Sequence, residues 1–257
     1  MQLVLLYMPA FVLILLRIAS MISALLFLGS KGESRWPKLI LTVALSAMIF
    51  ARHPQAISLD RDVSGFIASG MGEVILGLAL GFAVQLAFAA FRISGSLIGN
   101  EMGFAMAQVM DPTTGMNSPV IGRFFETLAF LYFFAVNAHH RIFELLSGSF
   151  DLIPIGKPWS LGALKEGLLQ LTGAMMSLGI RLAIPIYATT ILTTITLIVL
   201  AKAVPQINLM EFAFAVRILI AIFALILFTT QLGPLFFQGF DQVFSGIENM
   251  ARAMGKS

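Results

Sequence analysis

Residues 66–91 read FIASGMGEVILGLALGFAVQLAFAAF, and this stretch decides the fold class. A helix crosses the hydrocarbon core of a bilayer with roughly 20 apolar residues, so the stretch is long enough to span. Within it, Glu73 is the one charged residue and Gln85 the one amide. The stretch therefore predicts a membrane-spanning helix.

The rest of the chain has the same character. Of its 257 residues, 58% are hydrophobic and 11% are charged, with a mean hydropathy of +0.93. Soluble domains usually carry about 25% charged residues, so lipid or a large oligomer must cover this surface. We expect an all-α membrane protein of long, partly broken helices, with polar breaks between the apolar runs. The further strong spans are expected at residues 3–29, 122–138, 172–200 and 212–237, and a weak one at 39–51.

Charge and cysteine content exclude several classes of site. The chain has no cysteine, which rules out disulfides and thiolate metal sites. The net charge is +3 with the basic residues scattered, so we expect no nucleic-acid partner. The pair His139-His140 with Glu144 does not have the spacing of a zinc motif, and no catalytic dyad or phosphate loop can be made out. We expect no enzyme activity, no cofactor and no metal. Lys and Arg are balanced between the two sides, so they do not orient the spans.

Charges inside the predicted spans need partners, because an unpaired charge in lipid is costly. Arg123 and Glu126 are three residues apart and could pair on one helix. The others have no local partner and must pair between helices or with a second subunit. Glu73 is the only acid deep within its span, which gives little support for a proton relay. The candidates for these charge pairs are Arg17, Glu73, Arg123, Glu126, Arg181 and Arg217.

Glycines recur at a spacing of four residues, at positions 77 and 81 and again at 95, 99 and 103. This spacing opens a smooth groove in which a second helix can approach closely. Two interpretations stay open: packing within this chain, or packing against neighbouring subunits. The candidate packing residues of this kind are Gly77, Gly81, Gly95, Gly99 and Gly103.

A methionine stripe leads into a loop rich in turn-forming residues. Methionines recur every fourth residue at 102, 106 and 110, and the pair Asp111-Pro112 then stops the helix, because proline disfavours helical geometry in the residue before it. Methionine re-packs easily, so it can seal an irregular gap. Ordinary core packing is the alternative interpretation. We identify a candidate pore plug or gasket in Met102, Met106, Met110, Asp111, Pro112, Gly115, Met116 and Pro119.

The last residues form an amphipathic pattern. From position 240, apolar residues fall on one helical face and polar residues on the other. This predicts a C-terminal helix for an interface or a partner.

Several ordered motifs resemble the FliR family of flagellar biosynthetic proteins, and together they cover about three quarters of the chain. They are the glycine-rich stretch 77–85, the run from Gly95 to Pro119, the segment 137–156 and the sequence Pro205-Gln206-Ile207-Asn208. Where the family usually has Gly before the paired histidines, this chain has Ala138; Ala213 and Ala215 stand where the family tends to have Gly and Pro. Pro205, Gln206 and Asn208 join the candidate subunit-packing residues through this resemblance.

The resemblance implies a structural, pore-forming subunit of the flagellar type III export gate. A P-like part, roughly residues 1–170 with a plug loop at 103–121, is expected before a Q-like part at 171–257, both built from hairpins and packed into a helical hetero-oligomer. The implied partners are the P-, Q-, B- and A-type subunits (FliP, FliQ, FlhB and FlhA), unfolded export substrates, and lipid before assembly. The implied location is the bacterial inner membrane and flagellar basal body, with the assembled gate displaced towards the periplasm.

Two other functions remain as alternatives. The first is the T subunit of a virulence injectisome, which has the same mechanism in another machine. The second is a secondary transporter that uses the in-span charges for ion coupling. Transporters often show inverted repeats with matched broken helices, and no convincing repeat is visible in this sequence.

Overall fold

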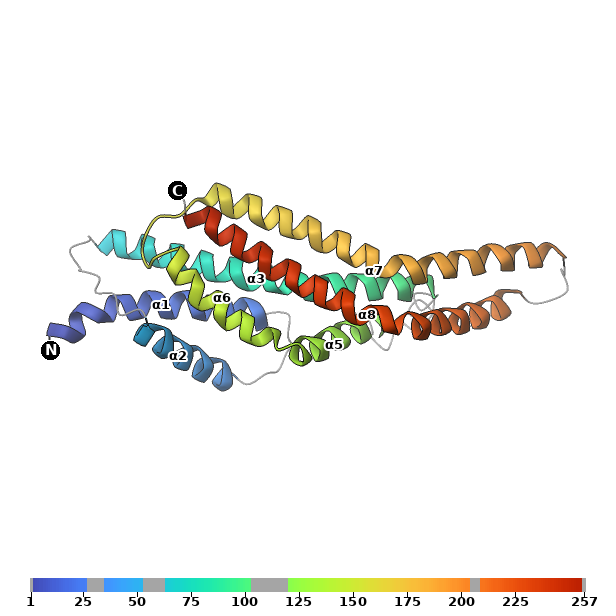
Figure 1. Ribbon diagram of the computed structural model, residues 1–257, viewed down its shortest axis with the longest axis horizontal. Coiled ribbons are helices and arrows are strands. Elements are labelled where there is room, and N and C mark those ends of the chain that lie inside the picture. The colour runs from blue at the N-terminus through green and yellow to red at the C-terminus, as the bar shows by residue number, and fades with distance from the viewer. Residues whose placement is uncertain (1, 27–34, 53–62, 103–119, 204–208, 256–257) are drawn as a thin grey trace. The chain divides into compact units, whose positions relative to one another are not determined.

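The protein is almost entirely helical in the part of the chain that its computed structural model describes, residues 2–26, 35–52, 63–102, 120–203 and 209–255 (Figure 1). No strand occurs among these residues. The predicted all-α class is therefore confirmed. In chain order the helices are α1 (Gln2–Leu26), α2 (Arg35–Arg52), α3 (Val63–Glu101), α5 (Val120–Ala135), α6 (Ala138–Leu152), α7 (Leu161–Ala203) and α8 (Leu209–Gly255).

The described helices form a multi-pass membrane protein. Three stretches are long and apolar enough to cross a bilayer alone: Tyr7–Leu25, Ser64–Glu101 and Leu161–Ala203. Two pairs of consecutive segments pass the same test as broken spans: Ile121–Ala135 with Ala138–Leu152, and Ala215–Phe228 with Thr230–Gly255. The described residues thus hold three spans, or up to five, and the predicted five strong spans correspond to the upper number. The helix α2, expected to be weak, is not among them.

Contacts divide the chain into two units. Unit 1 comprises Met1–Leu86, His139–Thr172 and Gln242–Ser257, and in it α2 packs on α1 (Figure 1). Unit 2 comprises Ala87–Ala138 and Gly173–Asp241. The expected P-like and Q-like parts divide the chain by resemblance rather than by contact, so that division stays a prediction.

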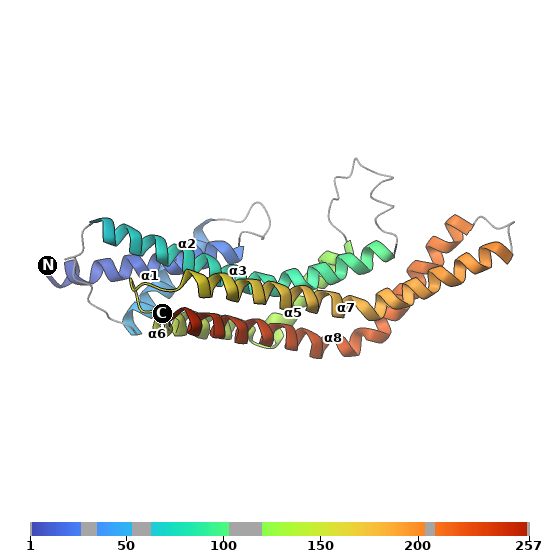
Figure 2. The same ribbon diagram turned by 90° about the horizontal axis from the view of Figure 1, so that it is seen from above.

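In unit 2 the later part of α7 and the earlier part of α8 run side by side in both views (Figure 1, Figure 2). An aromatic cluster fills the core of this unit, where the ring of Phe91 lies 4.3 Å from that of Phe236 and 5.4 Å from that of Phe240, measured between centroids. Aromatic pairs at such separations contribute beyond the area they bury. The same cluster holds Phe88, Phe133 and Tyr132.

Two predicted boundaries differ from the structure, because a tertiary contact surface extends one helix and a local N-cap sets the start of the other. The apolar run 66–91 lies inside α3, which continues to Glu101. Beyond position 91, Ser94 and Ile98 are buried, so the helix face keeps contacts after the sequence turns more polar. The run 172–200 likewise lies inside α7, which begins at Leu161. There the side chain of Ser160 accepts a hydrogen bond from the amide of Ala163, a typical N-cap.

The last helix combines two elements that the sequence predicts separately. The span 212–237 and the amphipathic tail form one helix, α8, which bends by 67° between Phe228 and Thr230. Pro234 explains the bend, because its ring clashes with the carbonyl four residues earlier and offers no amide hydrogen to it. The apolar face of the tail is buried within this chain, with Phe244, Ile247 and Met254 at most 2% exposed. The expectation that this face serves an interface or a partner is corrected accordingly.

Candidate functional site

A buried ion pair lies at the centre of unit 1. Nε of Arg17 on α1 donates to Oε2 of Glu73 on α3 at 2.5 Å. The two side chains are 1% and 3% exposed. The sequence analysis predicts that the in-span charges Arg17 and Glu73 need partners. In the structure these two residues pair with each other. The pair joins two helices whose contacting residues lie 56 positions apart.

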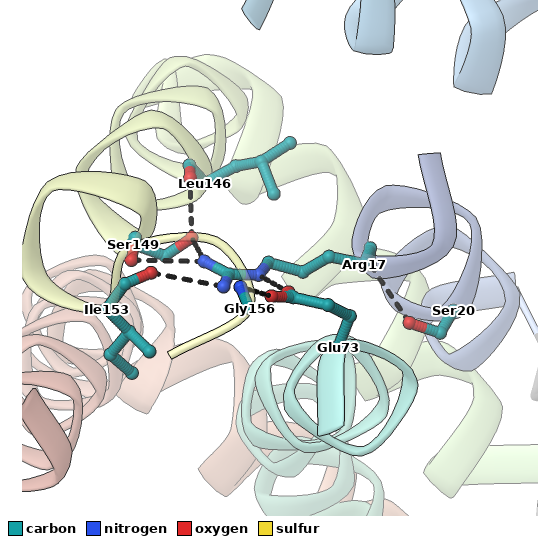
Figure 3. Close-up of polar contacts among 7 residues, drawn as sticks. All are labelled: Arg17, Ser20, Glu73, Leu146, Ser149, Ile153 and Gly156. Carbon is teal, nitrogen blue, oxygen red and sulfur yellow. Dashed lines mark hydrogen bonds and ion pairs between the residues drawn. The ribbon is translucent and has the colours of Figure 1, made fainter. Parts of the chain in front are cut away.

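The guanidinium of Arg17 uses its other donors at the C-terminal end of α6 (Figure 3). Nη1 donates to the carbonyl of Ser149 at 3.1 Å and to its hydroxyl at 3.4 Å, and Nη2 donates to the carbonyl of Ile153 at 3.1 Å. The last carbonyls of a helix lack intrahelical partners and carry partial negative charge, so a cation is stabilised there. The ring of Phe150 lies under the guanidinium, 4.2 Å from centroid to Cζ.

Glu73 uses its second oxygen to hold the turn after α6. Its Oε1 accepts a hydrogen bond from the amide of Gly156 at 2.9 Å (Figure 3). Gly156 has a φ of 69°, a left-handed conformation that glycine adopts without steric cost. One pair of charges therefore ties together α1, α3, the end of α6 and the turn that leads to α7. We call the set Arg17, Glu73, Ser149, Ile153 and Gly156 the Arg17 network.

Two glycines allow α1 to approach α3 closely beside this network. A Cβ at Gly77 would overlap the carbonyl oxygen of Arg17 and the hydroxyl of Ser20, and one at Gly81 would lie 2.5 Å from the carbonyl oxygen of Met21. One turn further along α3, Nε2 of the Gln85 side chain donates to the backbone carbonyl of Ala24. Glycine at these two positions brings the helices near enough for the short side chain of Glu73 to reach Arg17.

In unit 2 the next pair of glycines on α3 plays the same role towards α5. A Cβ at Gly95 would lie 2.6 Å from the carbonyl oxygen of Ile121 and 2.8 Å from Cα of Gly122, and one at Gly99 would lie 3.2 Å from Cβ of Ile121. The contacts of these four glycines are therefore within the chain, the first of the two interpretations left open. Packing of the glycines against other subunits stays a prediction.

The remaining in-span charges do not join the network. Glu126 pairs with Arg92 at 3.6 Å, a partner that the spacing did not suggest, and Arg123 is exposed on the same helix as Glu126. Arg181 is exposed on α7. Arg217 on α8 is half-buried, and its Nε has no hydrogen-bond acceptor among the described residues.

Part of the predicted site lies outside the described residues. Met102 is inside them and is buried at 1% exposure, with its amide closing the last turn of α3 on the carbonyl of Ile98. The residues of the predicted plug and of the packing motif that fall outside are Gly103, Met106, Met110, Asp111, Pro112, Gly115, Met116, Pro119, Pro205, Gln206 and Asn208.

Sequence reasoning missed the acceptors on α6. The segment containing Ser149, Phe150 and Ile153 stands out only through the family resemblance, because a backbone carbonyl leaves no signal in a sequence. Among the described residues, no three His, Asp or Glu side chains gather closely enough to hold a metal ion. The rings of His139 and His140 lie 4.3 Å apart, as adjacent residues at the start of α6.

The relationships of the chain agree with this architecture. The family model described as bacterial export proteins, family 1, matches residues 8–243. The flagellar biosynthetic protein FliR of Bacillus subtilis is 27% identical, with 97% of each chain covered. FliR of Pectobacterium carotovorum is 31% identical, covering 72% of this chain and 71% of the relative. The surface presentation of antigens protein SpaR of Shigella sonnei is 27% identical, covering 59% and 58%. The chain belongs to family 1 of the bacterial export proteins.

Proposed function

We propose that this protein is a structural and pore-forming subunit of the flagellar type III export gate, and that it helps to form and to plug the conduit for unfolded flagellar substrates. The observation that carries the proposal is the match to FliR of Bacillus subtilis over 97% of both chains. This relationship extends over nearly the whole of both chains. In this function the chain binds and positions other chains and carries no catalytic step.

The geometry of unit 1 supports a structural function. In the Arg17 network the two charges pair with each other and with backbone groups, so they are neutralised inside the chain.

The outward-facing surfaces of α7 and α8 in unit 2 are apolar by contrast. In the hairpin of α7 and α8, large apolar side chains are 40–67% exposed: Ile191, Leu192, Ile195, Ile198, Val199, Leu200, Leu219, Ile222, Phe223, Ile226 and Leu227.

Such a surface suits burial against other apolar helices. Continuous exposed apolar area of this kind marks an interaction site or a membrane surface. The partners in this proposal are the P-, Q-, B- and A-type subunits of the gate (FliP, FliQ, FlhB and FlhA), with lipid covering the same faces before assembly. The location is the inner membrane and the flagellar basal body, with the gate displaced towards the periplasmic side.

The plug in this proposal is the loop at 103–121. Its support comes from the sequence: methionines at a spacing of four lead into a run of turn-forming residues within an apolar chain. Soft methionine contacts can close a pore and give way to a substrate. Met102, the residue directly before this loop, is buried.

A T subunit of a virulence injectisome is the second candidate. The match to SpaR favours it but covers only 59% of the chain, whereas the match to FliR of Bacillus subtilis covers 97%. The flagellar assignment therefore has the broader support.

The test has two parts. The gene is deleted in its own bacterium, and swimming motility and flagellin secretion are measured with and without a plasmid copy. The tagged chain is then purified in mild detergent, and the co-purifying chains are identified by mass spectrometry. We expect loss of motility that the plasmid restores, together with recovery of P- and Q-type subunits. Normal motility, or purification without any gate subunit, would contradict the proposal.

A further inference from the structure

One charge lies exposed in the middle of the apolar surface of α7. Arg181 is an exposed residue of α7, and on the same side of the helix Met176, Ile180 and Ile184 are 47%, 47% and 54% exposed. Ser177 is exposed on this side too. We call Met176, Ser177, Ile180, Arg181 and Ile184 the Arg181 face.

Arg181 makes no hydrogen bond or ion pair with any residue in the described ranges, in contrast to Arg17 and Arg92. A charge inside an apolar span is costly unless another group pairs with it. The chain pairs Arg17 with Glu73 and Arg92 with Glu126 across helices, whereas Arg181 faces outward. Arg181 therefore needs a partner other than the described residues of this chain.

The length of α7 shows that lipid alone does not cover this surface. Between Glu166 and Lys202 the helix contains no charged residue except Arg181. At 1.5 Å per residue, residues 167–201 extend about 52 Å, well beyond the roughly 30 Å of a hydrocarbon core. At the tilts of up to about 40° that transmembrane helices adopt, part of this apolar length lies outside the hydrocarbon.

Placing Arg181 at the membrane surface does not remove this difficulty. Residues 182–201 would then fill the hydrocarbon core, and the apolar side chains before Arg181 would face water. These side chains include Leu169 at 64% exposure, besides Met176 and Ile180. A partner protein whose surface is apolar and carries one acid would cover the exposed apolar residues and would also pair with Arg181.

We propose that the Arg181 face docks a membrane-embedded helix of a neighbouring gate subunit, and that this helix offers a carboxylate to Arg181. The inference rests on the proposed function, because it places the chain in a hetero-oligomer. Beyond that function, the inference identifies which surface of this chain docks a partner and which chemical groups the partner helix carries. The exposed apolar residues bury against apolar side chains of the partner helix, and the ion pair fixes the register of the two helices.

Crosslinking in the otherwise unchanged protein tests the surface directly. A photo-reactive amino acid at Ile184 is activated in cells that contain the whole gate, and the crosslinked peptide is sequenced. We expect a peptide from a transmembrane helix of a gate subunit that contains Asp or Glu. The same probe at Phe143, an exposed residue of α6, serves as the matched control and should not give that peptide.

Charge variants then test the ion pair. Arg181→Glu should lower the amount of co-purified partner at least about tenfold, because losing one member of a desolvated charge pair costs much of the affinity. Arg181→Lys should retain most of it. Replacing the crosslinked acid by Lys should restore binding to Arg181→Glu. Arg252→Glu, at a 61% exposed position on α8, is the control and should bind as the unchanged chain does.

Two results would overturn the inference while leaving the proposed function intact. One is lipid-only crosslinking from Ile184 in a gate that still co-purifies its partners, which assigns this face to the bilayer. The other is equal partner recovery for Arg181→Glu and the unchanged chain. Failure of the proposed function would look different, because the unchanged chain would then recover no gate subunit.

Discussion

At the scale of residues, the Arg17 network shows how a membrane protein accommodates charge. Removing two charges from water costs several kcal/mol for each ion, and good geometry with further hydrogen bonds must offset that cost. Both members of this pair have such bonds: Arg17 reaches the end of α6, and Glu73 reaches the amide of Gly156. The network therefore selects one arrangement of α1, α3 and α6 among those that apolar packing alone would allow.

The strength of this coupling can be measured. Arg17→Leu or Glu73→Leu alone leaves one uncompensated buried charge, so each should lower the stability by about 3–5 kcal/mol. The double variant should lose clearly less than the sum of the two. Thermal unfolding of the purified chain in detergent measures these losses. Arg252→Ala, which breaks an exposed pair with Glu248, should cost no more than about 1 kcal/mol. Additive losses at positions 17 and 73 would show that the two side chains do not interact.

At the scale of elements, the packing of α1 on α3 depends on the absence of a side chain at Gly77. Gly77→Ala places a Cβ onto the backbone of α1, so the helices must separate and the Arg17 network must stretch. Gly148 on α6 is the matched control, because a Cβ there meets nothing within 4 Å.

Alanine exceeds glycine in helix propensity by up to about 1 kcal/mol, so Gly148→Ala should raise the melting temperature while Gly77→Ala lowers it. Melting curves of the two variants, recorded in the same detergent, decide the matter. A rise for Gly77→Ala would mean that α1 and α3 are not in close contact.

The bend in α8 follows from one residue. Pro234→Ala restores an amide donor and removes the clash of the ring, so the helix should straighten. Spin labels at Leu219 and Phe237, both exposed, report the change, since a cysteine-free chain allows labelling at introduced cysteines alone. A straight helix places these positions about 27 Å apart, and the bend shortens that separation by a few ångströms. An unchanged distance distribution would place the cause of the bend elsewhere.

The elements differ in how far the sequence predicts them. Apolar runs predict that helices exist around residues 66–91 and 172–200, because lipid-length apolar stretches have few other structures. Buried contacts at Ser94 and Ile98 set the end of the first helix, and the cap at Ser160 sets the start of the second. Hydropathy along the sequence shows neither of these. The amphipathic pattern from Phe240 predicts a helix correctly but not what covers it.

The same limit applies to the candidate site. Composition shows that Arg17 and Glu73 need partners, and the positions of Gly77 and Gly81 indicate a close helix contact. Neither shows that α1 is the helix in contact, since that depends on how the chain returns in space. Carbonyl acceptors such as those of Ser149 and Ile153 leave no trace in the sequence, because nearly every residue carries one.

At the scale of the whole molecule, the proposed function requires the chain to close a conduit as well as to build one, and the loop at 103–121 is our proposal for the closing part. Its removal separates the two tasks. Deleting residues 110–119 should leave the partner subunits bound, since the Arg17 network, the Arg181 face and the apolar hairpin of α7 and α8 lie elsewhere in the chain. With the soft obstruction gone, the reconstituted gate should conduct ions where the unchanged gate stays closed. Planar-bilayer recording of purified gates measures the conductance, and co-purification confirms assembly. Deletion of residues 55–59, between α2 and α3, is the control and should leave the gate closed. Intact assembly with unchanged conductance after deletion of 110–119 would remove this loop from the closing mechanism.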